Sequence, residues 1–136
     1  MHTTNYYDTF IQIAEDCPIS NAEVPPLKGD DKTIACLQFE MIIDNPYKYT
    51  SDDVIFFFFA VKNKITGKAG LAEARETFFS KGQACLRASP LTKRYGWGMH
   101  HNTEGKVAIY AADSAEYKKF AKDKTLKQLK AMKSKR

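Results

Sequence analysis

An apolar run of eight residues, 54–61, constrains the fold more than any other feature of the chain, and it contains four consecutive phenylalanines. Eight residues are too few to span a bilayer, because a transmembrane helix needs about twenty. The rest of the protein must therefore cover this run. Aromatic and β-branched residues dominate it, and both faces of a strand would be apolar here. We therefore predict a central strand that is buried on two sides.

Shorter patterns on either side of this run indicate alternating strands and helices. The predicted elements are a strand over 7–13, a helix that starts after Asp31 or Thr33 and stops at Asn45-Pro46, a helix over about 69–81, a short strand over 84–88, a hairpin of 95–101 and 106–111 across residues 102–105, and a helix capped by Asp113 or Ser114. This order predicts an α+β fold: a single domain with a mostly antiparallel sheet of about five strands, packed with two to three helices.

The length of 136 residues fits one domain, and the charges divide it into two parts. Residues 122–136 hold seven lysines and arginines and one acid, so this segment carries +6, whereas residues 1–121 carry −1. We predict a globular domain over 1–121 and a lysine-rich C-terminal tail over 122–136. Leu126, Leu129 and Met132 give the tail a thin apolar stripe, so we expect it to be partly helical.

The cysteines indicate a reducing compartment. Cys17, Cys36 and Cys85 are odd in number, widely spaced and in no C-x-x-C pair, which argues against a disulfide framework. Residues 1–8 have neither the basic nor the apolar segment of a signal peptide. Together these features predict a cytoplasmic protein with free thiols and no membrane partner.

A candidate binding site lies in residues 87–101, which contain three cations, the only tryptophan and two of the three histidines. On a strand over 95–101, Gly96, Gly98 and His100 would share one face and leave a flat floor. Such a floor accepts either a closely packed helix or a bound ligand. Guanidinium groups suit carboxylate or phosphate oxygens, and aromatic rings can stack on a ligand ring. The ligand hypothesis is a small anion held by a set of six residues: Arg87, Lys93, Arg94, Tyr95, Trp97 and His100.

Other kinds of chemistry find little support. The sequence contains no phosphate-binding, dinucleotide-binding, nucleophile-elbow or zinc-protease motif. His100 and His101 would point to opposite faces of a strand, so they predict no metal site. Paired acids such as Asp52-Asp53 suit helix caps better than acid–base catalysis. We therefore predict no cofactor and assign no catalytic residue, and the sequence does not decide whether the protein is an enzyme.

The basic tail gives an alternative function, the binding of nucleic acid or of an acidic protein partner. Lysines attract phosphates without reading sequence, and such binding weakens steeply with salt. A solvated terminus that aids solubility is the competing interpretation of the same residues. The sequence leaves the oligomeric state open.

Five segments of the chain carry a family resemblance: HTTNY at 2–6, AEDCP at 14–18, VPP at 24–26, NPYKYTSDDV at 45–54 and RASPLTKRYGWG at 87–98. On these segments the chain resembles the bacterial domain-of-unknown-function family 6157, over nearly its whole length. It departs from the expected pattern at 54–61, where four phenylalanines replace a more mixed strand. The resemblance implies a stand-alone protein of one domain and brings no catalytic residues.

Overall fold

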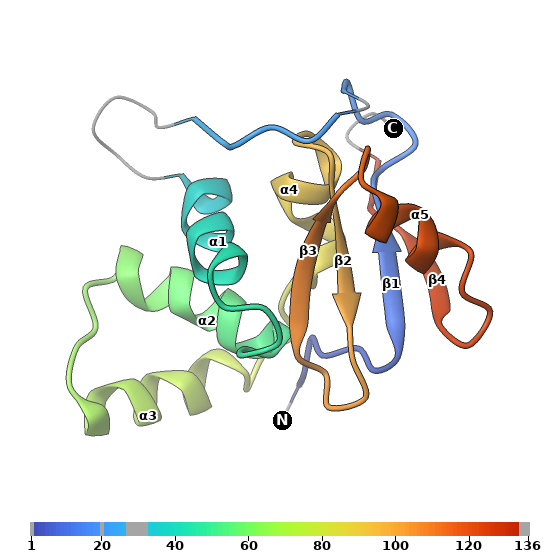
Figure 1. Ribbon diagram of the computed structural model, residues 1–136. Helices are drawn as coiled ribbons and strands as arrows, with labels where there is room; N and C mark the ends of the chain where they lie inside the picture. The colour runs from blue at the N-terminus through green and yellow to red at the C-terminus, as the bar shows by residue number, and fades with distance from the viewer. Residues whose placement is uncertain (1, 20, 27–32, 134–136) are drawn as a thin grey trace.

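A computed structural model of the protein describes residues 2–19, 21–26 and 33–133. Its centre is one sheet with the strand order β3-β2-β1-β4 (Figure 1). The four strands are β1 (Thr9–Gln12), β2 (Trp97–His101), β3 (Val107–Ala111) and β4 (Lys127–Lys130). β2 runs antiparallel to both β1 and β3, whereas β4 runs parallel to β1. The predicted α+β class is confirmed, with four strands in the described sheet in place of about five.

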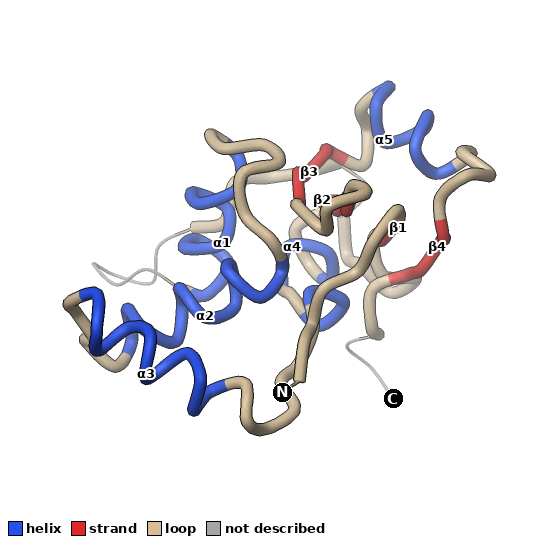
Figure 2. Tube along the Cα trace, turned by 90° about the horizontal axis from the view of Figure 1, so that it is seen from below, coloured by secondary structure: helices blue, strands red, loops and turns tan. Residues whose placement is uncertain are grey.

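Five helices and one short 3-10 turn surround this sheet in the described part of the chain. They are α1 (Ile34–Ile43), α2 (Ser51–Lys62), α3 (Lys68–Phe78), the turn η1 (Leu86–Ala88), α4 (Pro90–Lys93) and α5 (Ala115–Ala121). Viewed along the strands, α4 and α5 lie on opposite faces of the sheet (Figure 2). α1 and α2 lie beside the β3 edge, and α3 lies outside α2 (Figure 1). No described helix has the length and apolar character needed to cross a membrane.

The main core fills the side of the sheet that faces α1, α2 and α4. Ile11, Met99 and Ile109 project from three neighbouring strands into this core, where they meet Val54 of α2 and Leu91 of α4. A smaller cluster of Phe56, Ala60 and Phe79 joins α2 to the end of α3. The helices α1, α2 and α4 therefore pack directly against the sheet. The helix α3 has no buried residue of its own.

The prediction of a buried strand over residues 54–61 is wrong, because these residues form most of α2. A capping box starts the helix: the hydroxyl of Thr50 accepts a hydrogen bond from the Asp53 backbone N–H, and the Asp53 carboxylate accepts one from the Thr50 backbone N–H. Asp52 and Asp53 in the first turn also suit the positive end of the helix dipole. A short continuous apolar run has no periodicity that separates a buried strand from a buried helix.

Two further predictions of secondary structure are corrected. Residues 84–88 contain no strand: 86–88 form η1, and Ser89 caps α4 by accepting a hydrogen bond from Leu91 N, with Pro90 at the first helical position. The tail, predicted to be partly helical, forms β4 at 127–130 because the open edge of β1 supplies backbone partners. Lys127 N donates to Asp8 O, and Ala131 N donates to Gln12 O.

Several predicted elements are confirmed. The strand β1, the hairpin of β2 and β3, and the helix α1 with its cap at Thr33 all lie where the sequence predicts them. Asp31, the alternative cap, lies outside the described residues. α3 ends at Phe78, earlier than the predicted Lys81. Ser114 caps α5, so the last predicted helix is also confirmed.

The glycine face of β2 is covered by α5. Phe10 of β1 stacks on Phe120 and meets Tyr117 edge-on, with ring centroids 5.6 and 5.1 Å apart. A Cβ atom on Gly98 would lie 2.5 Å from Tyr117 Cε2 and 2.7 Å from Phe10 Cζ. Of the two uses that the sequence leaves open for this floor, the structure shows the close approach of a helix at Gly98.

Replacement of Gly98 by alanine tests this packing. Neither ring can yield easily, because Phe10 is fully buried and the Tyr117 hydroxyl accepts a hydrogen bond from Ile13 N at 3.0 Å. We expect a loss of about 1–3 kcal/mol in the free energy of unfolding, measured by urea denaturation. Gly70→Ala is the control, since its added Cβ meets no atom within 4 Å and alanine favours the helix. Equal effects of the two substitutions would contradict the packing.

His101 is the second test, because it is fully buried and, among the described residues, neither ring nitrogen has a hydrogen-bond partner. Burial, with a smaller contribution from His100, lowers the pKa of His101 to about 3. The unfolded chain takes up this proton near pH 6.5, so it binds more protons than the folded protein between about pH 6.5 and 3. Stability should therefore decrease as the pH falls through this range, by up to about 1.4 kcal/mol per pH unit.

The His101→Phe variant should show a shallower loss of stability between neutral and acidic pH than the parent protein. The measurement is the free energy of unfolding in urea at several pH values. His2→Gln serves as the control, because it removes a histidine that is exposed in the folded protein. If the pH dependence of stability is the same in His101→Phe as in the parent protein, the loss of stability at acidic pH does not come from the burial of His101.

Candidate functional site

Three of the six predicted ligand-binding residues are engaged elsewhere in the structure. Arg87 Nε donates a hydrogen bond to Lys130 O on β4 at 2.8 Å. Trp97 Nε1 donates to Glu23 O at 2.9 Å, and its ring tilts against Phe39. These side chains join segments of the fold, and neither lines the hollow that Lys93, Arg94 and Tyr95 share.

His100, the third, is held on the α5 face of the sheet. Its ring stacks on Phe120 with centroids 4.3 Å apart, and its Nδ1 shares a hydrogen bond of 2.8 Å with the Tyr47 hydroxyl. The same hydroxyl is hydrogen bonded to Tyr110 at 2.8 Å. Burial lowers the pKa of His100 below its usual value. The arrangement fastens the loop that carries Tyr47 to β2 and β3.

Lys93, Arg94 and Tyr95 are the three predicted residues that the structure does bring together. They line a hollow of about 360 Å³ beside the start of α1, along with Thr33, Ile34 and Ala35. The first turn of a helix carries unpaired N–H groups and a partial positive charge. Three of the six predicted ligand-binding residues thus share one hollow. This hollow adjoins the start of α1, which was not part of the site predicted from the sequence.

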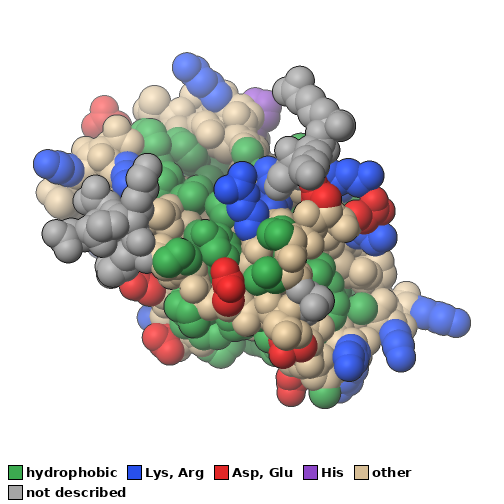
Figure 3. Space-filling view, turned by 90° about the horizontal axis from the view of Figure 1, so that it is seen from above, with side chains coloured by type: hydrophobic (Ala, Val, Ile, Leu, Met, Phe, Trp, Pro, Cys, Tyr) green, Lys and Arg blue, Asp and Glu red, His purple; other side chains and the backbone are tan. Residues whose placement is uncertain are grey.

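The positive charges of the C-terminal segment are partly matched by acids. Lys130 Nζ lies 3.2 Å and Lys133 Nζ lies 3.0 Å from the Glu15 carboxylate. Lys133 and Lys130 lower the pKa of Glu15 through these contacts. On the face shown in Figure 3, lysines and arginines lie both at the margin and near the centre, with acids among them. This view shows no continuous basic surface suited to a nucleic acid backbone.

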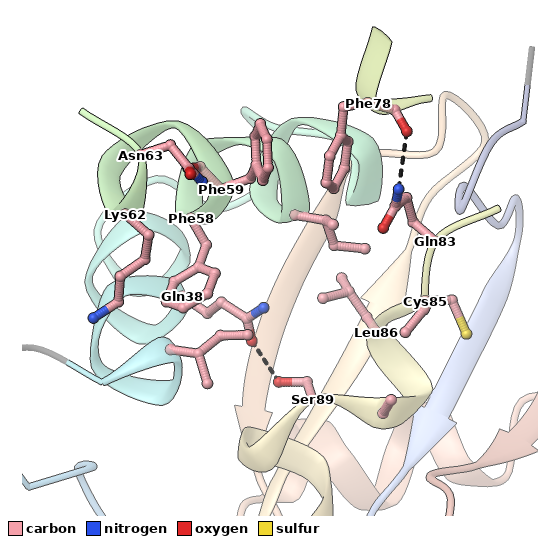
Figure 4. Close-up of a pocket in the computed structure, with 14 residues that line it drawn as sticks. Gln38, Phe58, Phe59, Lys62, Asn63, Phe78, Gln83, Cys85, Leu86 and Ser89 are labelled. Atoms are coloured by element: carbon pink, nitrogen blue, oxygen red, sulfur yellow. Dashed lines mark hydrogen bonds between the residues drawn. The ribbon is translucent and has the colours of Figure 1, made fainter. Parts of the chain in front are cut away.

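A cavity of about 300 Å³ lies between α1, α2, the end of α3 and the segment 83–89 (Figure 4). Its apolar walls come from Ile34, Ile55, Phe58, Phe59, Phe78 and Leu86. Polar atoms enter it at only a few points, chiefly from glutamine side chains. A mostly apolar cavity with a few placed polar groups is the usual form of a small-molecule site.

Gln38 lines this cavity and is 3% exposed. Its Oε1 accepts a hydrogen bond of 2.5 Å from the Ser89 hydroxyl, and that hydroxyl in turn accepts one from Leu91 N. This chain of bonds fixes the amide, so that Nε2 is turned into the cavity (Figure 4). Within the described part of the chain Nε2 has no hydrogen-bond partner.

Gln83 places a second amide at the opposite side of the cavity. Its Nε2 donates to Phe78 O at 2.9 Å, which leaves Oε1 turned towards the interior (Figure 4). Oε1 accepts no hydrogen bond from another described residue. Gln83 is half-buried and also lines a second hollow of about 720 Å³ against α3. It therefore stands at the boundary between the cavity and a more open space.

Two other residues of the cavity wall do not direct their reactive groups into it. The Cys85 sulfur is turned away from the interior (Figure 4) and lies 3.1 Å from the Tyr6 hydroxyl. Burial, and next the contact with Cys85, raises the pKa of Tyr6 to about 12. The Lys62 ammonium lies over the Phe58 ring at 5.7 Å from its centroid, on the outer side of the helix pair. The described residues contain no group of three or more histidines, cysteines or acids that could hold a metal ion.

Sequence reasoning missed the cavity and its two glutamines. One signal for Gln38 was present: it is the only neutral polar residue in the helix IACLQFEMII, and it follows Ile34 by one helical turn on the inward face. Gln83 gives no comparable signal, because it lies in an irregular segment between α3 and η1. Only the meeting of these distant segments makes the two amides parts of one site.

Comparison with known proteins gives one match. A family model described as a family of unknown function, DUF6157, matches residues 1–136. No curated protein and no solved structure matches the chain. The match covers the whole sequence and confirms the resemblance carried by the five segments. The chain therefore belongs to the DUF6157 family, a family of unknown function.

Proposed function

We propose that the protein binds a small, mostly apolar molecule in the cavity between α1, α2 and the segment 83–89, and that Gln38 Nε2 donates a hydrogen bond to it. The observation that carries this proposal is the buried amide of Gln38, which has one end fixed by Ser89 and the other turned into the cavity. A ligand with an acceptor at this point would satisfy the donor and fill the apolar volume.

The size and lining of the cavity support a ligand in preference to a packing defect. A volume of about 300 Å³ lies within the range of ligand sites. An apolar cavity can stay empty, but a polar donor inside one favours an occupant that can accept its hydrogen bond. Aromatic side chains on two helices, Phe58, Phe59 and Phe78, offer flat surfaces for the apolar part of such a ligand.

The Gln38 amide is also pre-organised for binding. The Ser89 hydroxyl is fixed by the N-terminus of α4, and Ser89 itself is 3% exposed. The donor therefore does not have to be ordered when a ligand enters, which lowers the entropic cost of binding. Gln38 lies in α1 and Ser89 caps α4, and both helices contribute residues to the main core.

The test compares acetophenone, which has a ring and a carbonyl acceptor, with ethylbenzene, which has a similar shape and no acceptor. Acetophenone should shift the backbone amide NMR signals of residues 83–89 and bind about fivefold or more tightly than ethylbenzene, since one hydrogen bond contributes about 1 kcal/mol. Gln38→Met, which keeps the volume and removes the donor, should abolish this preference.

Gln12→Met is the matched control, because Gln12 lies on β1 and bonds to Gln128 away from the cavity. It should keep the preference for acetophenone. If neither compound shifts the signals of residues 83–89, or if Gln38→Met still prefers acetophenone, the proposal is wrong.

A second candidate function is the binding of a small anion at Lys93, Arg94 and Tyr95. It is supported by the hollow of about 360 Å³ that these residues share with the first turn of α1. Inorganic phosphate should shift the NMR signals of Thr33, Ile34 and Ala35, and the double variant Lys93→Ser, Arg94→Ser should remove the shift. Phosphate shifts that persist in the double variant would exclude this site. Nucleic acid binding has no comparable support, since Lys130 and Lys133 are paired with Glu15.

A further inference from the structure

We infer that the ligand of the α1–α2 cavity is a neutral, flat aromatic compound with a hydrogen-bond acceptor at one end and a donor at the other. This inference rests on the proposed function and goes further, because it assigns the chemical class of the ligand. The observation behind it is the pair of glutamine amides, each tied to the protein at one end and turned into the cavity at the other (Figure 4).

The two amides offer opposite hydrogen-bonding groups. At Gln38 the carbonyl oxygen is used by Ser89 and the NH₂ group faces the cavity, so this end needs an acceptor on the ligand. At Gln83 the NH₂ group is used by Phe78 O and the carbonyl oxygen faces the cavity, so this end needs a donor. Figure 4 places them on opposite sides of the interior, which sets the polarity of the ligand along its length.

The lining also argues that the ligand is neutral and flat. Taking a charged group into an apolar cavity without a partner is strongly unfavourable. The cation of the wall, Lys62, extends to the outer side of the helices and lies over Phe58 (Figure 4). Phe59 and Phe78 lie with ring centroids 4.6 Å apart, and together with Phe58 they present aromatic surface to the space between the amides. Flat rings pack well against such surfaces.

The two ends differ in burial, and this difference predicts unequal contributions. Gln38 is 3% exposed, whereas Gln83 is half-buried and borders the more open hollow against α3. Water competes for Gln83 Oε1 more than for Gln38 Nε2. A hydrogen bond is stronger where the surroundings exclude water, so loss of the ligand's acceptor should weaken binding more than loss of its donor.

The experiment uses three ring compounds of similar shape at a pH where the phenols are neutral. 4-Hydroxyacetophenone has both groups, 4-fluoroacetophenone lacks the donor, and 4-ethylphenol lacks the acceptor. We expect dissociation constants that rise about threefold without the donor and about tenfold without the acceptor, measured by the shifts of the backbone amide signals of residues 83–89.

Two variants assign each end of the ligand. Gln83→Met should remove the difference between 4-hydroxyacetophenone and 4-fluoroacetophenone and keep the penalty for 4-ethylphenol. Gln38→Met should remove the penalty for 4-ethylphenol and keep the difference between 4-hydroxyacetophenone and 4-fluoroacetophenone. Melting temperatures check that both variants remain folded, and the comparison of compounds on the unaltered protein needs no variant at all.

The outcomes separate this inference from the proposed function. If 4-fluoroacetophenone binds as tightly as 4-hydroxyacetophenone while 4-ethylphenol binds weakly, the donor end is wrong and the proposed function stands. If 4-ethylphenol binds as tightly as the other two, the acceptor at Gln38 is wrong and both fall. A tighter complex with 4-hydroxybenzoate, the anionic analogue, would overturn the assignment of a neutral ligand.

Discussion

The fold depends on one buried carboxylate, that of Asp52 at the start of α2. It accepts three hydrogen bonds of 2.6 Å, from the hydroxyl of Thr3 and from both the backbone N–H and the hydroxyl of Thr4. The backbone N–H of Asp52 donates to the side chain of Asn5. An extended N-terminal segment is thereby tied to a helix about fifty residues further along the chain. Charge-assisted bonds of this kind are among the stronger ones in proteins.

This contact determines where the helices lie relative to the sheet. The N-terminal segment continues directly into β1, so Asp52 links the second residue of α2 to a central strand. The capping box at Thr50 and Asp53 then sets the helix start on the adjacent residues. With its first residues held in this way, α2 packs against α1, and its residues Phe58 and Phe59 line the cavity. The residues that fix this geometry lie in two of the segments that carry the family resemblance, 2–6 and 45–54.

Local sequence signals predicted the elements whose ends are marked by caps and turns. Thr33, Ser114 and the turn at 102–105 gave α1, α5 and the β2–β3 hairpin their limits. The run 54–61 was predicted as a strand because its composition favours one. The residues that start a helix here, Thr50 and Asp53, lie just before the run. The site was harder to predict, because Gln38, Ser89 and Gln83 become neighbours only through tertiary packing. The cations of 87–101 were conspicuous in sequence, yet half of the predicted set holds segments of the fold together.

The parallel pairing of β4 with β1 has a consequence for how the protein forms. β1 is synthesised first among the strands, but its two neighbours in the sheet come from residues 97–101 and 127–130. The first pairing closes a loop of about two thirds of the chain and the second closes a loop of nearly all of it, and such distant contacts make folding slow. During synthesis one edge of β1 therefore has no partner until residue 101 has left the ribosome, and the other has none until residue 130 has. Until then it depends on local collapse or on chaperones to avoid pairing with other chains.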